Sequence, residues 1–387
     1  MSYEETTKRE RLLDWMRHGD PEQVPVLFSP GFEVAASYLG KDEGEVTWAD
    51  AIRTAEETGT HNFAHLHGPL PHEAVPFLDD IHLRDEWDRT EEGIRRLTTW
   101  LETPAGTLKS VQEFPPNAGA YHREFLVKGE KDLEVLACFI RRTTDEIVAN
   151  PAVRRQVEET LLHTKQQARD VFPGCLWVFC PAVELTSCYY MDQATAIYAL
   201  YDRQDLMEEL MALHWRTTEI WMEVGARTGV DIYGYAVNGY EWLNPDLYER
   251  YMIPQATRIN EIAAAQGRLS WIHTCGKMKR IAAGDAYQRM GVDIVESLSA
   301  PPSGDVDDLA ETRRTIGPDI TTRGAINCEL MYSDDLGAVR ERAAQVLEAT
   351  RGFRHMVGDT NGSYPAYPWA NIKAVIDVVR EQGRLYD

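Results

Sequence analysis

The sequence has 387 residues, of which 43% are hydrophobic and 10% aromatic, so the chain can bury a large core and does not have the composition of a disordered protein. Sixty-two acidic against forty basic side chains give a net charge of -22, which disfavours nucleic acid or an anionic membrane as the main partner. No apolar run is long enough to span a membrane, and the charged N-terminal segment lacks the apolar stretch of a signal peptide. We therefore expect a cytoplasmic protein that acts on a small molecule.

The cysteines support the same expectation. Six cysteines in a chain of this length, without a repeating spacing, do not form a disulfide framework. A reducing cytoplasm is their natural environment, and most of them should be buried thiols.

Along the chain, residues 1–23 predict a helical extension, after which short apolar runs alternate with longer segments of helical period. Near-continuous apolar strands separated by helices indicate a parallel sheet covered on its outer face. Eight such units predict a (β/α)8 TIM barrel, with residues 1–387 forming a single domain. The eight apolar runs are 25–29, 62–67, 176–184, 230–238, 269–275, 292–298, 320–326 and 353–359.

Two further segments stand out. The clearest helix is predicted over 203–228, where apolar residues fall on one face and Gly229 closes the helix. Residues 77–127 break the alternation, and their ETPAGTLKSVQEF stretch predicts a hairpin around Pro104, Ala105 and Gly106. We interpret 77–127 as an insertion after the second strand, forming a lid or side ribbon rather than a separate domain.

In barrels of this kind the active site gathers at the C-terminal ends of the strands. Polar residues at these ends are therefore the candidate site residues. They are His65, His67, Glu184, Cys188, Asn238, Glu241, His273, Cys275, Glu296, Asn327, Cys328, Asp359 and Asn361.

The most specific of these signals is WIHTCG, residues 271–276. In a strand, residues two apart point to the same face, so His273 and Cys275 would both point inward. An imidazole beside a thiolate suits Zn²⁺, although a buried histidine next to a buried thiol would give the same pattern. Zinc needs at least one more protein ligand, for which Cys328 is the best thiolate candidate. Oxygen ligands could come from Asp359, Glu184 or Glu296.

Substrate binding and acid–base chemistry have weaker signals. Aromatic residues are dense near the same loops and could hold an aromatic ring or a quaternary ammonium, or could pack between barrel and helices. Burial at apolar strand ends would raise the pKa of a carboxyl toward values that suit acid–base catalysis. Alternatively, Arg323 could pair with these carboxylates and satisfy their charges. We expect the catalytic carboxylates to be Glu184, Glu296 and Asp359. The expected substrate-binding residues are His67, Tyr189, Tyr235, Asn238, Tyr240 and Asn361.

Several motifs are absent from the sequence. It has no G-x-x-x-x-G-K-[ST] phosphate loop, no G-x-G-x-x-G opening a helix after a strand and no G-x-S-x-G nucleophile elbow. DIHLRD, residues 80–85, lacks the glycine of the corrinoid-ligating D-x-H-x-x-G motif, so we expect a surface loop there and no cobalamin-binding domain in this chain.

From about residue 24 onward, several segments occur in this order: PVLFSPGFEVAASYLG, ETPAGTL, NPDLYERYMIPQATRI, WIHTCGKM, GVDIVESLSAPPSGDVDDLAETRRTIG, RGAIN and NIKAVIDVVREQG. Their order resembles the uroporphyrinogen decarboxylase superfamily, and H-x-C-G is the most specific point of this resemblance. The superfamily comprises true decarboxylases and zinc-dependent methyltransferases that work with corrinoid proteins.

The resemblance is closer to the methyltransferase branch. The decarboxylases carry an arginine-containing motif after the first strand, where this sequence has SPGFEVA, residues 29–35. The H-x-C motif of the methyltransferases matches His273 and Cys275, but their usual third ligand is a cysteine after the eighth strand. Here that place reads GDTNG, with Asn361 near the cysteine's position, so Cys328 or Asp359 would replace it.

The leading hypothesis is a zinc-dependent methyltransferase that moves a methyl group between a small substrate and a separate corrinoid protein. The resemblance and the aromatic loops suggest a methoxylated aromatic, a methylamine or a thiol as substrate. The alternative is a corrinoid-independent lyase or decarboxylase that uses the strand-end carboxylates. A third interpretation is a ligand-binding barrel without catalysis. The oligomeric state is open, and a homodimer is compatible with the sequence.

Overall fold

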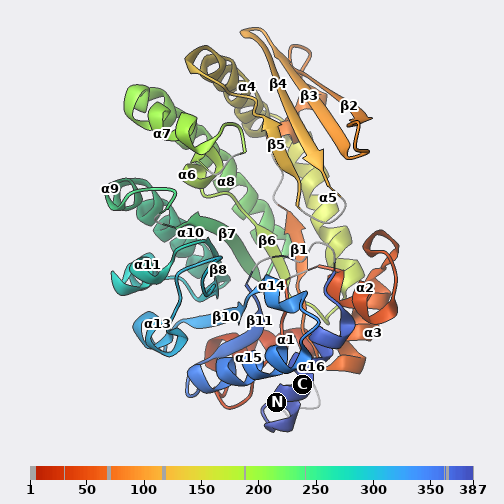
Figure 1. Cartoon of the computed structure of the whole chain (residues 1–387). Coiled ribbons are helices and arrows are strands. Elements are labelled where there is room, and N and C mark those ends of the chain that lie inside the picture. Colours follow the sequence, from red (N-terminus) through yellow and green to blue (C-terminus); the bar gives the residue numbers. More distant parts are fainter. Residues whose placement is uncertain are drawn as a thin grey trace. The chain divides into compact units, whose positions relative to one another are not determined.

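The computed structural model divides into two compact units, which Figure 1 colours along the sequence. Unit 1 comprises residues 1–66, 161–177 and 229–387, and unit 2 comprises residues 67–160 and 178–228. The expectation of one domain over residues 1–387 stays a prediction. The residues that the structure describes are 6–29, 31–67, 71–115, 119–186, 189–239, 241–360, 362 and 366–386, without the side chains of His67, Pro71, Asn238 and Cys275.

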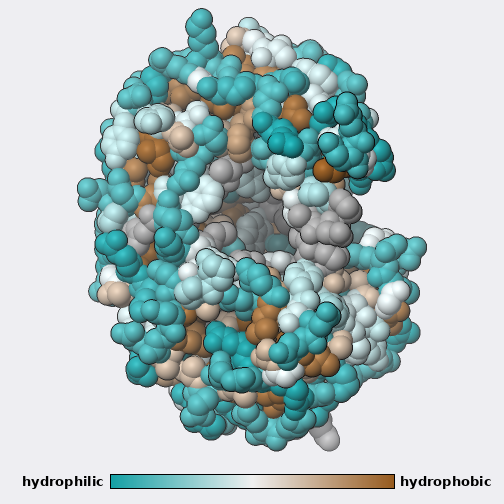
Figure 2. All heavy atoms as spheres, in the orientation of Figure 1, coloured by the Kyte–Doolittle hydropathy of each residue, from teal (hydrophilic) through white to brown (hydrophobic). Residues whose placement is uncertain are grey.

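The surface is largely hydrophilic on the face shown in Figure 2, in keeping with the net charge of -22. Hydrophobic residues are scattered over this face. Within the described residues, no helix is both long and apolar enough to cross a membrane.

Unit 1 is built on a seven-stranded sheet whose strands from β6 to β11 run parallel to their neighbours. The segment Val24–Leu27 lies between β11 and the residues before β1: Leu27 N–H donates to Val357 O at 2.9 Å, and His61 N–H donates to Val26 O at 2.8 Å. This segment takes the place of an eighth strand, so unit 1 is an α/β fold of TIM-barrel type. In sheet order the strands are β1 (Ala64–His67), β6 (Gly174–Trp177), β7 (Ile232–Asn238), β8 (Leu269–Cys275), β9 (Ile294–Ser297), β10 (Thr321–Ile326) and β11 (His355–Asp359).

One helix of unit 1 precedes the segment Val24–Leu27, and the other helices follow that segment or one of the strands in sequence. The first one begins at a capping box, in which Thr7 Oγ1 accepts from the Glu10 N–H at 3.2 Å and the Glu10 carboxylate accepts from the Thr7 N–H at 2.9 Å. A π-helical turn, Tyr248–Met252, connects α9 to α10. The helices are α1 (Lys8–His18), α2 (Glu33–Leu39), α3 (Trp48–Thr58), α9 (Pro245–Leu247), α10 (Ile253–Ala265), α11 (Lys279–Ala283), α12 (Ala286–Met290), α13 (Leu309–Ile316), α14 (Cys328–Met331), α15 (Leu336–Ala349) and α16 (Trp369–Glu381).

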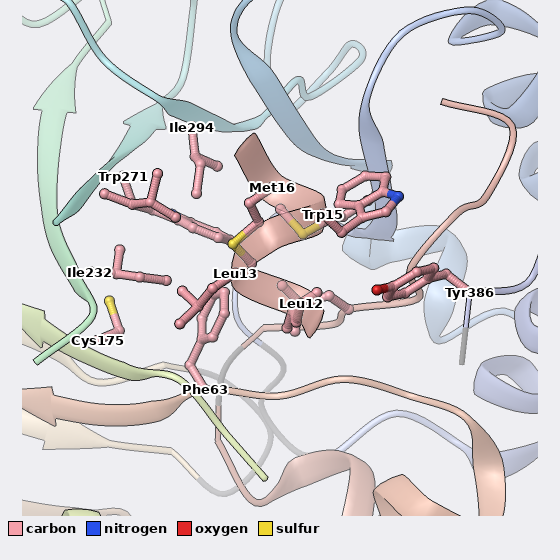
Figure 3. Close-up of a cluster of buried hydrophobic side chains, with 13 residues drawn as sticks. Leu12, Leu13, Trp15, Met16, Phe63, Cys175, Ile232, Trp271, Ile294 and Tyr386 are labelled. Carbon is pink, nitrogen blue, oxygen red and sulfur yellow. The ribbon is translucent and has the colours of Figure 1, made fainter. Parts of the chain in front are cut away.

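Helix α1 closes the N-terminal end of the barrel. Figure 3 shows Leu12, Leu13 and Met16 of α1 pointing toward side chains that come from the beginnings of the strands, among them Ile232 and Ile294. All of these residues are buried. The predicted helical extension is therefore part of the core, and it leaves the opposite end of the strands for polar residues.

Unit 2 contains a four-stranded antiparallel sheet and the helices that follow it in sequence. Helix α4 packs on this sheet, since a Cβ added at Gly106 would lie 3.2 Å from Val135 of α4, and α5 runs on from unit 2 into unit 1. The elements are β2 (His82–Arg89), β3 (Arg95–Thr103), β4 (Gly106–Phe114), β5 (Tyr121–Glu124), α4 (Glu130–Ala149), α5 (Pro151–Ala168), α6 (Pro181–Thr186), α7 (Gln193–Asp202) and α8 (Gln204–Thr228).

Four local predictions need correction, although the helix expected at 203–228 is confirmed as α8. The third strand ends at Trp177 and not at 184, because Pro181 begins helix α6 and proline is favoured in the first turn of a helix. The run 25–29 forms isolated bridges rather than a strand. The predicted hairpin around Pro104 and Ala105 is confirmed as β3 and β4, but the insertion is a four-stranded sheet, since β2 and β5 flank this hairpin. DIHLRD continues into strand β2 instead of forming a loop.

Candidate active site

The candidate site of unit 1 begins with His273 of β8 and Glu296 of β9. The two residues lie opposite each other in the strand register, and His273 Nδ1 is 2.5 Å from Glu296 Oε1. His273 shares its face of β8 with Trp271, whose side chain belongs to the core of the barrel, so His273 also faces inward. Trp177 lies beside the imidazole, with the ring centroids 6.5 Å apart.

Electrostatics fix which nitrogen of His273 carries the proton. Burial would raise the pKa of Glu296, but the Arg323 guanidinium and His273 lower it to about 2. Glu296 is therefore ionised at neutral pH and accepts only, so His273 Nδ1 donates to it. In the neutral imidazole, Nε2 then carries the free lone pair. Nε2 is therefore the nitrogen that could bind a metal or accept a proton.

Arg323 of β10 connects Glu296 to Asp359 at the end of β11. Its Nη1 donates to Glu296 Oε2 at 2.9 Å, its Nη2 donates to Asp359 Oδ1, and its Nε donates to Leu27 O at 3.0 Å. The arginine side chain is only 1% exposed. Two buried carboxylates thus share one guanidinium, which offsets part of their desolvation and holds both side chains in place.

Asp359 accepts from several donors besides Arg323. The Ser29 N–H and Oγ donate to its two oxygens at 2.7 and 2.8 Å, and the Tyr367 hydroxyl donates to Oδ2 at 3.0 Å. This set of donors suits an ionised carboxylate. Because both oxygens are engaged, Asp359 is held as a structural anion at the end of the barrel.

The thiol of Cys328, the first residue of α14, joins the same network through Tyr367. The Tyr367 hydroxyl lies 3.0 Å from Cys328 Sγ, and Thr360 Oγ1 lies 4.0 Å from it. Tyr367 is buried against Phe28 and Tyr332, with ring centroids 6.4 and 4.8 Å away. A continuous series of contacts therefore runs from the imidazole of His273, through Glu296, Arg323, Asp359 and Tyr367, to the thiol of Cys328.

The backbone around this network adopts unusual conformations. Ser297 and Leu298 at the end of β9 have φ values of 91° and 51°, and Ala325 in β10 has φ 77°. A Cβ added at Gly324 would lie 2.3 Å from the Ser297 carbonyl oxygen, so only glycine fits there. Strained backbone of this kind concentrates at functional sites, and here it flanks Glu296 and Arg323.

Of the predicted metal ligands, the structure places His273 and Cys328 at one end of the barrel. Cys275 ends strand β8, but its side chain lies outside the description. Among the described residues, no three His, Cys, Asp or Glu side chains are grouped as a metal site. Zinc binding therefore stays a prediction.

Of the predicted catalytic carboxylates, Glu296 and Asp359 meet at Arg323, whereas Glu184 belongs to unit 2. Glu184 lies on helix α6 and not at a strand end, because the third strand is shorter than predicted. It is buried, and burial raises its pKa to about 8. Its role in acid–base chemistry is a prediction that no contact tests.

The predicted substrate-binding residues are spread over both units. Tyr235 of β7 is buried against helix α10, where its hydroxyl donates to Asn260 Oδ1 at 2.7 Å, which is the packing role that the sequence also allowed. Tyr189 of unit 2 is exposed. His67 and Asn238 end β1 and β7 without described side chains, and Tyr240 and Asn361 lie outside the described residues.

Sequence reasoning missed the parts that Ser29 and Tyr367 play. Ser29 ends the first apolar run, so the strand-end argument could have found it. Tyr367 follows β11 in an irregular segment, and no periodicity in the sequence indicates that its hydroxyl contacts both Asp359 and Cys328.

Comparison with known families settles the relationship. The model of the uroporphyrinogen decarboxylase (URO-D) family matches residues 148–382. The chain belongs to this family. A search of curated proteins finds no significant match.

Solved structures share the fold of this member of the uroporphyrinogen decarboxylase family. A methyltransferase from Methanosarcina mazei superposes with a TM-score of 0.62 at 16% sequence identity, covering 97% of this chain and 99% of that chain. A putative vitamin-B12 independent methionine synthase from Listeria monocytogenes matches with a TM-score of 0.44 at 12% identity, covering 94% of this chain and 97% of that chain. At these identities the likeness concerns the fold, and the second similarity is too low to support an argument.

Proposed function

We propose that this chain is a zinc-dependent methyltransferase that moves a methyl group between a small substrate and a separate corrinoid protein. The observation that supports it most is the His273–Glu296 contact at 2.5 Å, because an ionised carboxylate on Nδ1 makes Nε2 the metal-binding nitrogen. Carboxylate–histidine pairs of this form accompany zinc ligands in many enzymes. The family match and the shared fold with a methyltransferase are compatible with this proposal.

His273, Cys275 and Cys328 are the proposed zinc ligands. Both oxygens of Asp359 already accept hydrogen bonds, which favours Cys328 over Asp359 as the third ligand. The Tyr367 hydroxyl lies 3.0 Å from Cys328 Sγ and fixes the position of the sulfur, which metal binding requires as a thiolate.

Bound zinc would supply a Lewis acid that activates a thiol or polarises the heteroatom of a methyl donor. The chain's own residues hold that site: Glu296 orients the imidazole, Arg323 fixes Glu296, and Tyr367 holds the thiol of Cys328. The substrate class is a methoxylated aromatic, a methylamine or a thiol.

The test is the metal content of protein purified without chelator, for the wild type and for His273→Ala, Cys275→Ser and Cys328→Ser. About one zinc per chain in the wild type, lost in the first two variants, is the expected result. Loss in Cys328→Ser as well would identify the third ligand. Cys138→Ser, in helix α4, is the matched control and should keep the metal. A wild type that takes up no zinc even after incubation would exclude this mechanism.

A second candidate function is a corrinoid-independent lyase or decarboxylase. Glu184 favours it, because a buried carboxyl with a pKa of about 8 can donate a proton at neutral pH. Glu296 and Asp359 fit this chemistry less well, since their oxygens are held by Arg323 and neighbouring donors. Turnover of a small acid without any corrinoid protein, lost in Glu184→Gln, would support the lyase over the methyltransferase.

A further inference from the structure

A cavity of about 360 Å³ lies at the N-terminal end of the barrel in unit 1. Its walls come from α1, from the last turns of α5 and from the segment that leads into β6. Arg9 in one wall donates to Asp231, the residue that precedes β7, so the cavity lies where the strands begin. The candidate active site lies where the strands end, and the methyl-transfer chemistry therefore makes no use of this cavity.

Positive charge is concentrated around the cavity, although the chain carries a net charge of -22. Arg9, Lys165 and Arg169 line it, and Asp170 is the one acidic side chain among the described residues that do so. Lys165 lies three residues after Leu162, which brings both side chains to the same face of α5. An excess of cations at one place in an acidic protein favours an anionic ligand.

One of these cations is already paired within the chain. Arg9 Nε donates to Asp231 Oδ2 at 2.8 Å, Arg9 Nη2 donates to Oδ1, and Asp231 is buried. Asp170 lies 3.9 Å from Arg9 Nη1, but its side chain is 77% exposed, so water screens most of its charge. Glu10, the other acid near Arg9, accepts from the Thr7 N–H at 2.9 Å. The single charge of Asp231 is therefore matched by Arg9.

Lys165 lies in a positive environment. Its Nζ donates to Gly229 O, which holds the ammonium group at the cavity. Burial lowers the pKa of Lys165, Asp231 opposes this effect, and Arg9 and Arg268 lower the pKa further. The pKa stays below its usual value, so the charges around Lys165 do not compensate for its burial. An anion in the cavity would do so.

Two arginines supply further positive charge. Among the described residues, the Arg169 side chain has no hydrogen-bond or ion-pair partner, and the buried Nε of Arg268 has no acceptor. Arg169 follows α5 with a φ of 52°, in the left-handed region that favours glycine. Backbone strain at a residue with a side chain concentrates at functional sites. Arg169 is therefore a candidate for binding a ligand.

The number of unmatched charges indicates a dianion. Lys165, Arg169 and Arg268 carry three positive charges, and Asp170 offsets one of them at most, which leaves about two. A phosphate monoester carries about −1.5 to −2 charges at neutral pH, and its three oxygens accept from several donors. The planar donors of arginine match these oxygens in pairs. A single carboxylate would leave one of the positive charges unmatched.

An apolar wall indicates that the ligand also has a carbon skeleton. Leu162 is 41% exposed, and it lines the cavity together with Phe172. Covering Leu162 with apolar atoms of a ligand is favourable, because it removes apolar surface from water. The volume suits a small molecule, whereas a long polyanion would meet the negative charge of the rest of the chain.

We propose that this cavity binds a small organic phosphate monoester. Lys165, Arg169 and Arg268 hold its dianionic group, and its apolar part lies on Leu162. The site goes beyond the proposed methyl transfer, and it requires neither zinc nor a corrinoid protein.

The first test is isothermal titration calorimetry of the full chain with phenyl phosphate, benzoate and inorganic phosphate. One phenyl phosphate should bind per chain, at least about tenfold more tightly than benzoate, which has the same ring but a single charge. Inorganic phosphate should bind several-fold more weakly than phenyl phosphate, since it lacks the apolar part. A wild type without saturable binding of phenyl phosphate, or with equal affinities for phenyl phosphate and benzoate, would overturn the proposal.

The second test assigns the binding to this cavity. Arg169→Ala and Arg268→Ala should each weaken the binding of phenyl phosphate by about tenfold, with circular dichroism unchanged. Leu162→Ala should weaken it several-fold and leave the binding of inorganic phosphate unchanged. Arg155→Ala removes an exposed arginine earlier on α5 and is the matched control, which should keep both affinities. An affinity for phenyl phosphate that is unchanged in both arginine variants would place the ligand elsewhere and contradict the proposal.

Discussion

Two buried glutamates, one in each unit, show how local partners decide the chemistry of a carboxyl. Glu296 at the end of β9 is 6% exposed and Glu184 on α6 is 8% exposed. The guanidinium of Arg323 and the imidazole of His273 outweigh burial at Glu296 and lower its pKa to about 2, whereas burial raises the pKa of Glu184 to about 8. Equal burial therefore gives a fixed anion in one region and a protonated acid in the other.

The difference also separates two possible chemistries. At the end of β9–β11, the carboxylates are committed to holding His273 and the segment around Ser29 in place. This arrangement suits a site that binds a metal or a substrate in a fixed geometry. On α6, a carboxyl that titrates near neutral pH suits proton transfer.

Of the substitutions that test this comparison, removal of Arg323 should cause the largest loss of stability. Arg323→Met leaves Glu296 and Asp359 buried without their shared cation, and we expect a loss of about 3–5 kcal/mol in the free energy of unfolding at neutral pH. Urea denaturation measures this loss. At pH 4 the loss should be smaller, because Glu296 without the guanidinium can then be protonated.

A loss below about 1 kcal/mol for Arg323→Met would mean that the two carboxylates do not depend on the guanidinium. The pKa of Glu296 would then have to be lowered by another group. The contrast between Glu296 and Glu184 would lose its physical basis.

The second prediction compares the two glutamates by pH. The folded state keeps a proton on Glu184 that the unfolded state releases between pH 4.5 and about 8, so Glu184 lowers the free energy of unfolding as the pH rises through this range. Glu184→Gln cannot titrate, and its stability relative to the wild type should therefore increase from pH 5 to pH 8 by about 3 kcal/mol.

Glu296→Gln should show the opposite trend. The pKa of Glu296 is lowered from 4.5 to about 2, so its stabilising contribution is complete above pH 4.5 and is lost as the pH falls toward 2. The variant should be less stable than the wild type at pH 7, and this difference should shrink in acid. Parallel pH profiles for the two variants would contradict the assignment.

Much of the candidate site follows from the sequence, because parallel strands end at one edge of a barrel. That rule brings His273, Glu296 and Asp359 together without any knowledge of their contacts. It fails for Glu184, because the apolar run 176–184 contains the end of a short strand, a loop and the start of a helix. In an apolar segment this short, periodicity does not distinguish a strand from a helix.

The rest depends on packing that no local pattern determines. The alternation along β7 predicts two faces but not which one faces the helices, so the sequence alone makes Tyr235 a substrate-binding candidate, whereas its hydroxyl lies against Asn260. The contact of Tyr367 with Asp359 and Cys328 depends on the path of the chain after β11. The insertion is visible as a break in the pattern, but its four strands are not.

The third prediction concerns Tyr367, which connects the carboxylate network to Cys328. Tyr367→Phe removes one of the donors to Asp359, while Ser29 and Arg323 still donate, so we expect a loss of about 1 kcal/mol in stability. Tyr198→Phe, at an exposed position in unit 2, should have no measurable effect. A loss as large as that of Arg323→Met would show that Tyr367 is essential to the network.

The smallest loss of stability should come from an arginine-to-methionine substitution at an exposed ion pair, which is the same substitution that should cause the largest loss at the buried Arg323. Arg141 donates to both oxygens of Glu209 at 2.6 and 2.8 Å, a geometry as good as that of Arg323, but its side chain is 41% exposed. Water solvates Glu209 when the arginine is removed, so Arg141→Met should cost less than about 1 kcal/mol, and less still at high salt. If Arg141→Met and Arg323→Met cost the same, hydrogen-bond geometry would set the strength of these pairs. If they differ as expected, burial sets it.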